Sequence, residues 1–298
     1  MNKRHSAPPI LITGADGLVG RAICKSLEKE KVSFLPLTRV PSKAIGQQVN
    51  YDLSSNVSLP DVIDGPISGV VHLAAAVPMS SAYPDTEKMA DLTRQIDANV
   101  CDAAKSWGCP VIYASTCGLY NRRKDVLKKE GDDFIIDAST PYLVAKKEGE
   151  SRFLQYANSI VMRIAGPIGP GQRNSSVVSR FIAAARSGED ICLWGSGRRE
   201  QNFVDVIDLA KFVSLALKNP VNGVFNVASA TPTSMLDLAN EVVSVAESGS
   251  VVLAGVEDPN ELDTAHYDVS RAYEVYGWMA STPLRQSLQK ILKEEFRL

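Results

Sequence analysis

The stretch Ile10-Leu-Ile-Thr-Gly-Ala-Asp-Gly-Leu-Val-Gly20 decides the fold of this chain. Three apolar residues enter a glycine-rich turn, and residues 21–28 then have the composition of a helix. Gly14 permits a tight turn, Gly17 lets the backbone approach a pyrophosphate, and Gly20 lets the helix pack close to the strand. The helix N-terminus attracts phosphate. The spacing predicts a dinucleotide site, with a ligand-free turn as the alternative, and the other expected contacts are Asp16, Leu18 and Val19.

Composition excludes several classes of protein. The chain has 298 residues, of which 45% are hydrophobic and 22% charged, as in ordinary globular proteins. Its net charge of −2 gives no reason to expect a nucleic-acid or membrane partner, and its three histidines lack metal-ligand spacing. No stretch has the length of a membrane span or the pattern of a secretory signal. We therefore expect a cytoplasmic protein with reduced, buried thiols at Cys24, Cys101, Cys109, Cys117 and Cys192.

The first half of the chain alternates short apolar runs with helical segments, which is typical of a parallel sheet with helices on both faces. The runs at 69–73 and 110–115 are continuously apolar, as in strands buried on both faces. We expect a surface segment at 121–138. The expected strands are 9–13, 32–37, 48–51, 69–73, 110–115 and 160–164, and the expected helices are 19–30, 85–107 and 141–157. The pattern predicts a Rossmann doubly wound α/β sheet.

The regular alternation breaks after residue 165. Gly166-Pro-Ile-Gly-Pro-Gly171 predicts a rigid loop. We expect next a helix at 175–187, a strand at 190–194, a loop at 195–200, a helix at 206–218, and strands at 223–227 and 250–254. The prediction is a Rossmann domain of residues 1–165 plus about 203–228, and a smaller, mostly helical substrate lobe of about 166–202 and 229–298.

The end of the second predicted strand bears on the choice of cofactor. An acidic residue there would bind the ribose hydroxyls of NAD, whereas an arginine can pair with the 2′-phosphate of NADP. This chain has Thr38 and Arg39 at that place and no carboxylate nearby. We therefore predict NADP(H), with NAD(H) as the alternative if Arg39 is a solvated side chain. Asp52 and Leu53 follow the third strand and are placed to meet an adenine ring, although Asp52 could equally be an ordinary strand-end aspartate.

Thr140-Pro-Tyr-Leu-Val-Ala-Lys146 is the second informative stretch. Ser139 or Thr140 can cap a helix that begins at Pro141, which places Tyr142 and Lys146 four residues apart on one helical face. A phenol has a pKa of about 10, and a neighbouring ammonium favours the phenolate. The pair therefore predicts an acid–base group, with a core tyrosine and a solvated lysine as the alternative. The hydroxyl of Thr116 lies at the end of a central strand, where ligands bind, with ordinary turn chemistry at a strand end as the alternative.

Together these motifs resemble an extended short-chain dehydrogenase/reductase of the NAD-dependent epimerase/dehydratase family. The resemblance covers about residues 10–290, with the motifs in the family's order. They are Thr13-Gly-Ala-Asp-Gly-Leu-Val-Gly20, Val71-His-Leu-Ala-Ala75, Asn99, Ala114-Ser-Thr116 with Leu119-Tyr120, Tyr142-x-x-x-Lys146, Arg163 with Gly169-Pro-Gly171, and Phe203-Val-Asp-Val-Ile-Asp208.

The resemblance implies a role for each matching residue. Tyr142 would be the acid–base catalyst, Thr116 would orient the substrate oxygen, and Lys146 would lower the pKa of Tyr142 and hold the nicotinamide ribose. The remaining cofactor contacts that we carry over are Leu73, Ala74, Ala75, Asn99 and Ala114. Most relatives act on sugars joined to nucleoside diphosphates.

Three departures from the family pattern concern the substrate. Gly166 stands where the family often has asparagine, Gln201-Asn202 stands where an arginine usually holds a diphosphate, and 257–261 is acidic where a second arginine is common. Arg198 and Arg199 could substitute, or could be solvated. Thr116-Cys117-Gly118 lacks the acids of the family's dehydratases, which disfavours dehydration. The candidate substrate residues are Thr116, Cys117, Gly166, Arg198, Arg199 and Gln201.

The leading hypothesis is an NADP(H)-preferring oxidoreductase of a sugar carbonyl or alcohol, such as a 4-keto nucleotide sugar. The alternatives are a nucleotide-sugar 4-epimerase, a reductase or dehydrogenase of a non-nucleotide sugar or small ketone, and a non-catalytic cofactor sensor. The family often dimerises through the helices expected at 85–107 and 141–157. We therefore expect a homodimer, with candidate contacts at Ala90, Ile96, Val100, Phe153 and Tyr156. The alternative is that this stripe is ordinary core, which one sequence does not distinguish from an interface.

Overall fold

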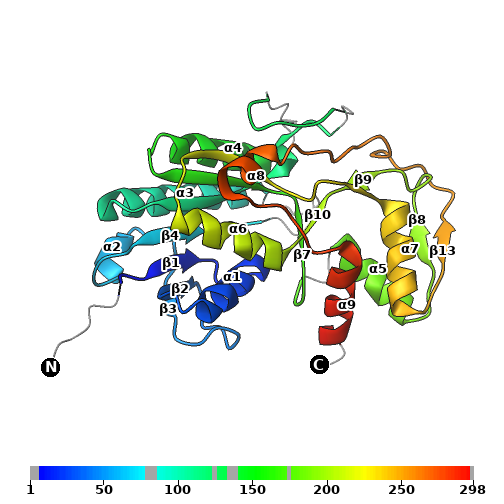
Figure 1. Cartoon of the computed structure of the whole chain (residues 1–298), viewed down its shortest axis with the longest axis horizontal. Helices are drawn as coiled ribbons and strands as arrows, with labels where there is room; N and C mark the ends of the chain where they lie inside the picture. Colours follow the sequence, from blue (N-terminus) through cyan, green and yellow to red (C-terminus); the bar gives the residue numbers. More distant parts are fainter. Residues whose placement is uncertain (1–6, 78–85, 123–125, 133–139, 173–175, 296–298) are drawn as a thin grey trace. The chain divides into compact units, whose positions relative to one another are not determined.

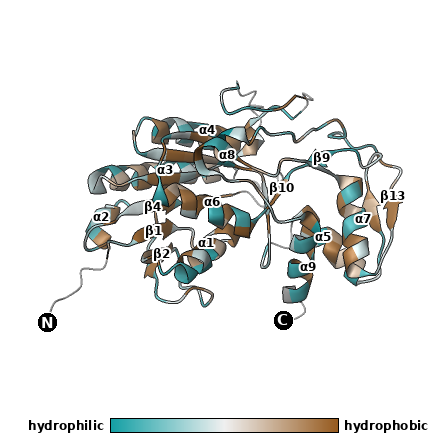
Figure 2. Cartoon of the chain, viewed as in Figure 1, coloured by the Kyte–Doolittle hydropathy of each residue, from teal (hydrophilic) through white to brown (hydrophobic). Residues whose placement is uncertain are grey.

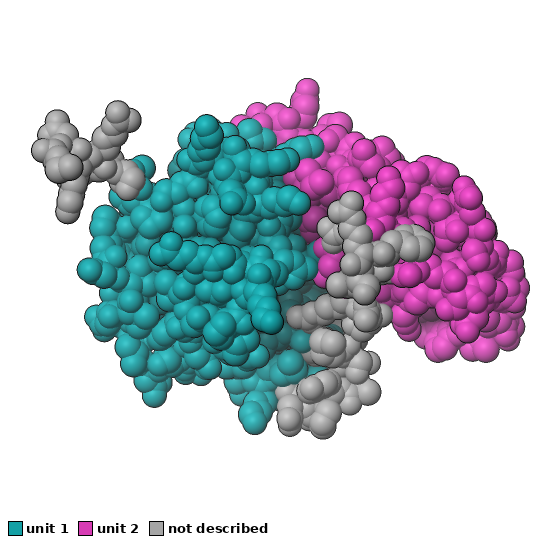
Figure 3. Space-filling model, turned by 90° about the horizontal axis from the view of Figure 1, so that it is seen from below, with its two compact units in different colours: residues 1–119, 135–164, 209–225 teal, residues 120–134, 165–208, 226–298 magenta. Residues whose placement is uncertain are grey.

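The structure, a computed structural model, describes residues 7–77, 86–122, 126–132, 140–172 and 176–295 (Figure 1). The chain divides into two compact units, which Figure 3 shows in different colours. Unit 1 comprises residues 1–119, 135–164 and 209–225, and unit 2 comprises residues 120–134, 165–208 and 226–298. Within the described parts of the chain, no helix has both the length and the apolar character needed to cross a membrane.

A seven-stranded sheet of order β11-β6-β5-β4-β1-β2-β3 organises unit 1. The neighbouring strands from β3 to β6 are all paired in parallel. β1 lies between β2 and β4, so the strand order reverses at β1, which is where open parallel sheets bind ligands. The Rossmann prediction is confirmed. The strands are β1 (Ile10–Thr13), β2 (Phe34–Thr38), β3 (Val49–Asn50), β4 (Gly69–His72), β5 (Val111–Thr116), β6 (Ser159–Ile164) and β11 (Gly223–Val227).

Helices pack against this sheet through apolar side chains. β1, β4 and β6 are buried along their whole length, which explains their continuous apolar character. Leu11, Val70 and Val111 of the strands share a core cluster with Val100 and Phe153 of two helices. Each such side chain contributes about 1.5–3 kcal/mol through burial. The helices are α1 (Leu18–Lys29), α2 (Leu59–Val62), α3 (Thr86–Trp107), α4 (Pro141–Leu154) and α6 (Val206–Lys218), with a 3-10 turn η1 (Cys117–Leu119).

Unit 2 combines short strand pairs with helices. β10 (Phe203–Asp205) pairs with β7 (Gly166–Ile168), β12 (Thr233–Ser234) with β9 (Glu200–Gln201), and β13 (Val251–Leu253) with β8 (Ile191–Leu193). Figure 2 shows β13 as a hydrophobic strand beside a helix of mixed hydropathy. A second core cluster joins β7 and β8 to the helices α5, α7 and α9. The helices are α5 (Val177–Arg186), α7 (Met235–Ala246), α8 (Ser270–Tyr276) and α9 (Leu284–Glu295).

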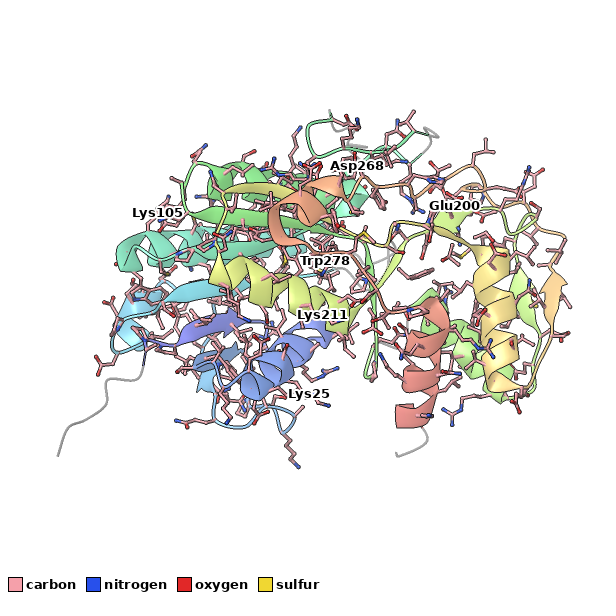
Figure 4. The ribbon with its side chains drawn as sticks, in the orientation of Figure 1. Lys25, Lys105, Glu200, Lys211, Asp268 and Trp278 are labelled. Carbon is pink, nitrogen blue, oxygen red and sulfur yellow. The ribbon has the colours of Figure 1, made fainter. Side chains whose placement is uncertain are left out.

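Polar contacts fix the ends of several elements of unit 2. Ser176 and Ser234 cap α5 and α7, because each hydroxyl accepts the N–H of the residue three positions on, at 3.0 Å. The indole of Trp278, which Figure 4 labels, donates to the carbonyl oxygen of Asp208 at 2.9 Å. The Asp208 carboxylate in turn accepts the backbone N–H of Thr282 at 2.7 Å. These bonds hold the chain that leads into α9.

Some predicted boundaries are wrong. The helix predicted at 141–157 ends at Leu154, because the N–H of Tyr156 already closes a tight turn onto the carbonyl of Phe153 at 2.8 Å. The loop predicted at 166–171 begins with strand β7, and the loop predicted at 195–200 runs into strand β9. Both errors concern short strands, whose pairing partners lie far away in sequence.

Some predicted environments are wrong as well. Lys128, in the supposed surface segment, is buried, and its ammonium donates to the hydroxyl of Thr264 at 3.1 Å. Thr140 precedes α4 without a side-chain capping bond, and Ser139 lies outside the described residues. All five cysteines are free thiols, as predicted, but Cys192 is exposed. Its side chain lies on the short strand β8, which alternates buried and exposed positions.

Four of the residues predicted to contact a second copy of the chain are interior residues. Ala90, Val100 and Phe153 are fully buried, and Ile96 is 9% exposed. α3 and α4 pack on each other and on the sheet, so their apolar faces form part of the core of unit 1. Tyr156 is partly buried against the same cluster and donates its hydroxyl to the carbonyl of Cys109 at 2.9 Å. The four buried residues are therefore wrong as dimer contacts and belong to the core, whereas a dimer contact at Tyr156 stays a prediction.

Candidate functional site

The glycine-rich turn joins β1 to α1, with Gly17 exposed at the N-cap. Gly14 has φ of +65°, a conformation that residues with a Cβ rarely adopt. A Cβ on Gly20 would lie 2.3 Å from the carbonyl oxygen of Gly14, so only glycine lets the helix approach the turn. No side chain caps α1, and its first turn has no acidic residue. The positive end of the helix therefore suits a phosphate, and the turn fits a dinucleotide.

The end of β4 lies directly against this turn. A Cβ on Gly14 would lie 2.9 Å from the backbone nitrogen of Ala74 and 3.1 Å from the carbonyl carbon of Leu73. The hydroxyl of Thr13 accepts the N–H groups of Leu73 and Ala74 at 3.2 and 3.3 Å. Ala75 follows in the same half-buried segment. The structure thus brings the predicted cofactor residues of β1 and β4 together at the point where the strand order reverses.

Thr38 and Arg39 differ sharply in environment. Thr38 is buried, and its hydroxyl donates to Oε1 of Gln48 at 2.6 Å and accepts from Nδ2 of Asn50 at 2.8 Å. These bonds tie the end of β2 to β3 and occupy the hydroxyl within the protein. Arg39, one residue further on, is exposed. Of the two residues, only Arg39 presents a side chain to solvent.

Asp52 and Leu53 follow β3. The exposed carboxylate of Asp52 accepts from the hydroxyl and backbone N–H of Ser54, and these bonds, with a smaller effect of the Arg39 charge, hold the pKa of Asp52 below its ordinary value. Leu53 is buried in the core, and its carbonyl accepts from Nδ2 of Asn99 at 2.7 Å. Asn99, a predicted cofactor residue, therefore fixes the loop after β3.

Tyr142 and Lys146 lie one turn apart on α4, which begins at Pro141. Tyr142 is half-buried, whereas Lys146 is only 3% exposed. The ammonium of Lys146 donates to the carbonyl oxygen of Ala114 at 2.8 Å and to the hydroxyl of Tyr113 at 3.1 Å. Ala114, predicted from the resemblance to touch the cofactor, thus anchors Lys146 through its backbone. Both anchors belong to β5, so the sheet fixes the position of the ammonium.

Opposing effects act on the charge of Lys146. Burial is the largest effect and holds its pKa below the ordinary value, and the carboxylates of Asp97 and Glu150 oppose that shift. Glu150 is itself buried and paired with Arg163, whose Nε and Nη2 donate to its two oxygens at 3.0 and 2.9 Å. A buried ammonium requires such negative partners to stay charged. Tyr142 lies one helical turn before this ammonium on α4.

Thr116 ends β5 beside the first turn of α4. Its Oγ1 accepts the N–H of Gly118 at 3.0 Å, and a Cβ on Gly118 would lie 3.2 Å from both that oxygen and Cδ2 of Leu143. The turn after β5 therefore packs on the residue next to the candidate catalytic tyrosine. Cys117 is buried, and its thiol donates to the carbonyl oxygen of Arg163 at 3.2 Å. The Cys117 thiol is therefore buried and hydrogen-bonded within unit 1.

The predicted substrate residues of unit 2 lie in different environments. The side chain of Arg198 is 74% exposed, 3.5 Å from the carboxylate of Glu261. The side chain of Arg199 is 27% exposed, 3.4 Å from the carboxylate of Asp258. The two arginines are adjacent in sequence but are held by different acids. The others are Gly166, exposed in β7, and Gln201, half-buried in β9.

A cavity of about 380 Å³ lies within unit 2. Arg199 lines it, together with Arg180 and the aromatic rings of Phe181 and Trp194. The indole of Trp194 is among the most exposed large apolar groups of the described chain, at 56%. The carboxylates of Asp190 and Asp258 also line it, so two acids accompany the two guanidinium groups and the two aromatic rings. Arg198, Gly166 and Gln201 are not among its lining residues.

A family model described as the NAD dependent epimerase/dehydratase family matches residues 10–228. The chain belongs to this family. The match begins at β1 and extends to the residue after β11, so it contains the glycine turn, Tyr142 and Lys146. The resemblance inferred from the motifs is therefore confirmed.

Curated and solved members resemble the chain over nearly its full length. A dTDP-4-dehydro-6-deoxy-D-allose reductase from a Streptomyces species is 26% identical, with 96% of each sequence aligned. MoeE5, solved with UDP-glucuronic acid and NAD, has a TM-score of 0.85 at 23% identity and covers 97% of this chain and 99% of its own. A UDP-N-acetylglucosamine 4-epimerase from Methanobrevibacter ruminantium M1 reaches 0.87 at 20% identity, covering 97% and 98%. The two structures share the fold of this chain.

Sequence reasoning missed two groups of residues in this family member. Arg180, Phe181 and Trp194 meet at the cavity only because α5 and β8 pack together, and no motif marks them. Asp97 and Tyr113 surround Lys146 from α3 and β5. The one available signal for Asp97 was a carboxylate placed among the apolar residues of a buried helix face.

Proposed function

We propose that this chain is a nicotinamide-dependent oxidoreductase of nucleotide sugars, which interconverts a carbonyl and an alcohol, as in a 4-keto sugar. The observation that carries the proposal is the buried ammonium of Lys146, fixed on β5 one helical turn from Tyr142. The same unit contains a glycine turn that fits a dinucleotide. A cofactor sensor without turnover has no need of a phenol beside a buried cation.

Each catalytic residue has one proposed task. The nicotinamide supplies hydride chemistry when it is bound. Tyr142 gives or takes the proton of the substrate oxygen, Thr116 orients that oxygen through its hydroxyl, and Lys146 stabilises the phenolate and hydrogen-bonds the ribose. The glycine turn holds the pyrophosphate at the N-terminus of α1. These tasks need a charged Lys146, which its two buried carboxylates support.

NADP(H) is the proposed cofactor, because the position after β2 carries the exposed cation Arg39 and no carboxylate. A guanidinium suits a 2′-phosphate through paired hydrogen bonds. The family name and the NAD complex of MoeE5 keep NAD(H) as the competing cofactor.

The proposed substrate is a sugar joined to a nucleoside diphosphate. The proposed place for it is the cavity of unit 2, whose lining includes the rings of Phe181 and Trp194 for a base and the cations Arg180 and Arg199 for a diphosphate. The carboxylates of Asp190 and Asp258 in the same lining oppose these two charges. These two arginines would do what the family's arginine does where this chain has Gln201. The chemistry agrees with the curated relative, which is a reductase of a dTDP-linked keto sugar.

The test is to mix purified protein with NADPH or NADH and a set of dTDP- and UDP-linked 4-keto sugars, and to follow nicotinamide absorbance and sugar products. The proposal expects one equivalent of reduced cofactor to disappear for each alcohol formed. Epimerised sugar without net cofactor consumption would identify a 4-epimerase instead. Turnover of free sugars or small ketones with no response to nucleotide sugars would contradict the proposed substrate class.

A further inference from the structure

A row of buried, hydrogen-bonded polar groups leads through unit 1 to Lys146. The side chains of His72 and Asp97 are both 0% exposed, and Nε2 of His72 lies 3.0 Å from Oδ1 of Asp97. The other carboxylate oxygen, Oδ2, accepts the hydroxyl of Tyr113 at 2.7 Å. That hydroxyl accepts from the ammonium of Lys146 at 3.1 Å. One continuous set of hydrogen bonds thus joins β4, α3, β5 and α4.

At the end of this hydrogen-bonded row farthest from Lys146, Thr13 fixes the protonation of His72. The hydroxyl of Thr13 accepts the backbone N–H groups of Leu73 and Ala74, so its own proton is directed to Nδ1 of His72, 2.7 Å away. Nε2 therefore carries the imidazole proton and donates it to Asp97. Burial lowers the pKa of His72, in agreement with a neutral ring. His72 consequently contributes a hydrogen bond to Asp97 and no positive charge.

The helix α4 is shaped to admit this set of bonds. A Cβ on Gly149 would lie 2.1 Å from the hydroxyl of Tyr113 and 2.4 Å from Oδ2 of Asp97. Any larger residue would force the phenol away from the carboxylate. The ring of Tyr113 is also stacked on Phe153, with centroids 4.4 Å apart. Tyr113 is thus held from both sides, with its oxygen between the carboxylate and the ammonium.

The charges around Lys146 leave two candidates for its counter-ion. The titratable groups around it are Asp97 of α3, His72 of β4, Tyr113 of β5 and Glu150 of its own helix. Arg163 of β6 lies behind Glu150, and Tyr142 acts electrostatically on Tyr113. The double hydrogen bond from Arg163 already balances the charge of Glu150. Burial raises the pKa of Asp97, but the Lys146 charge and the bonds from His72 and Tyr113 outweigh this and keep it below its ordinary value. Among the described residues, the printed partners of the Asp97 carboxylate are His72 and Tyr113, and Lys146 is the cation with the largest electrostatic effect on it.

We propose that Asp97 is the buried counter-ion of Lys146, a positioning residue that acts through Tyr113 to keep the ammonium charged and fixed against β5. The proposal rests on the proposed function in one respect, namely that a charged Lys146 serves Tyr142. It assigns a role to Asp97, Tyr113 and Gly149 that the Tyr-x-x-x-Lys motif does not contain.

The test is the titration of Lys146 in the free protein, by NMR of lysines labelled at Cε, with the Lys146 signal assigned from Lys146→Arg. Asp97→Asn keeps the shape and removes the charge, so the charged lysine loses its partner and its pKa falls. We expect a fall of at least about one pH unit, or tenfold weaker proton binding. Asp91→Asn is the matched control, because Asp91 lies on the same helix with its side chain 67% exposed.

An unchanged Lys146 titration in folded Asp97→Asn would overturn the proposal. If Asp97→Asn does not fold, Tyr113→Phe is the second test, because it removes the hydroxyl that joins Asp97 to Lys146 and leaves the carboxylate in place. The proposal requires a lowered Lys146 pKa in this variant as well. An unchanged Lys146 pKa in folded Tyr113→Phe would overturn the proposal. The titration uses neither cofactor nor substrate. Failure of the proposed function would therefore appear as full activity of Tyr142→Phe, which is a separate result.

Discussion

Arg39 is the residue on which the choice between the two nicotinamide cofactors depends. Its side chain is exposed directly after β2. Arg39→Ser removes the cation that would pair with a 2′-phosphate, so we expect NADPH to bind about tenfold more weakly or worse, since a charged hydrogen bond contributes about 1.5–3 kcal/mol. NADH affinity should change little. Calorimetric titration of both cofactors measures this, with exposed Lys43→Ser as the control. Equal losses for both cofactors would contradict the assignment.

His72 makes the stability of unit 1 depend on pH. Its folded pKa is lowered by burial, whereas the unfolded chain takes up a proton near pH 6.5. Below that pH the unfolded state binds more protons, so stability is lost as the pH falls. We expect the free energy of unfolding to fall by up to about 1.4 kcal/mol per pH unit from this residue. Urea unfolding of the wild type and His72→Gln between pH 5 and 7.5 measures the slope, which should be shallower in the variant. Parallel slopes would contradict the account.

The strand–turn–helix element built from β1 and α1 has no room for a side chain at Gly20. Its Cβ would meet the Gly14 carbonyl oxygen at 2.3 Å. Gly20→Ala should therefore cost about 1–3 kcal/mol of stability through overpacking and should weaken cofactor binding. Gly46→Ala is the control, since a Cβ there meets nothing within 4 Å. Thermal unfolding and cofactor titration compare the two variants. Equal behaviour would show that the turn tolerates a larger residue.

Elements with strong local signals were predictable from the sequence. The apolar runs of β1, β4, β5 and β6 and the glycine spacing led directly to the sheet and its turn. Short strands such as β9 and β12 escaped prediction, because two residues carry no periodicity and their pairing depends on partners distant in sequence. The apolar stripe of α3 was a candidate interface with core burial as the alternative, since periodicity cannot distinguish a core face from an interface; the structure shows the core.

The candidate site likewise contains residues that could be predicted from the sequence and residues that could not. The Tyr142 and Lys146 pair was visible because helical spacing is local. The groups that hold Lys146 were not, because Asp97 and Tyr113 reach it only through the packing of α3 and β5. Arg199 was a candidate by sequence, yet only the folded unit separates it from Arg198 by placing it on the cavity.

At the scale of the whole molecule, the cavity of unit 2 gives a prediction about substrate binding. Arg199→Ala and Arg180→Ala each remove a cation from its lining. We expect UDP or dTDP to bind about tenfold more weakly in each, by the usual contribution of a charge-assisted hydrogen bond. Arg198→Ala is the control, because Arg198 is 74% exposed and off the cavity. Calorimetry with the free nucleotide measures this, and a loss confined to Arg198→Ala would contradict the assignment. The homodimer and the cytoplasmic location stay predictions.

Hydride transfer from the nicotinamide to the sugar is tested most directly with a deuterium label. NADPH deuterated at its transferable position is incubated with a nucleoside diphosphate 4-keto sugar, and mass spectrometry locates the label. We predict deuterium on the sugar product of the wild type, and at least about a hundredfold slower transfer in Tyr142→Phe with NADPH binding retained. Label that never reaches the sugar, or transfer by Tyr142→Phe at the wild-type rate, would contradict the account.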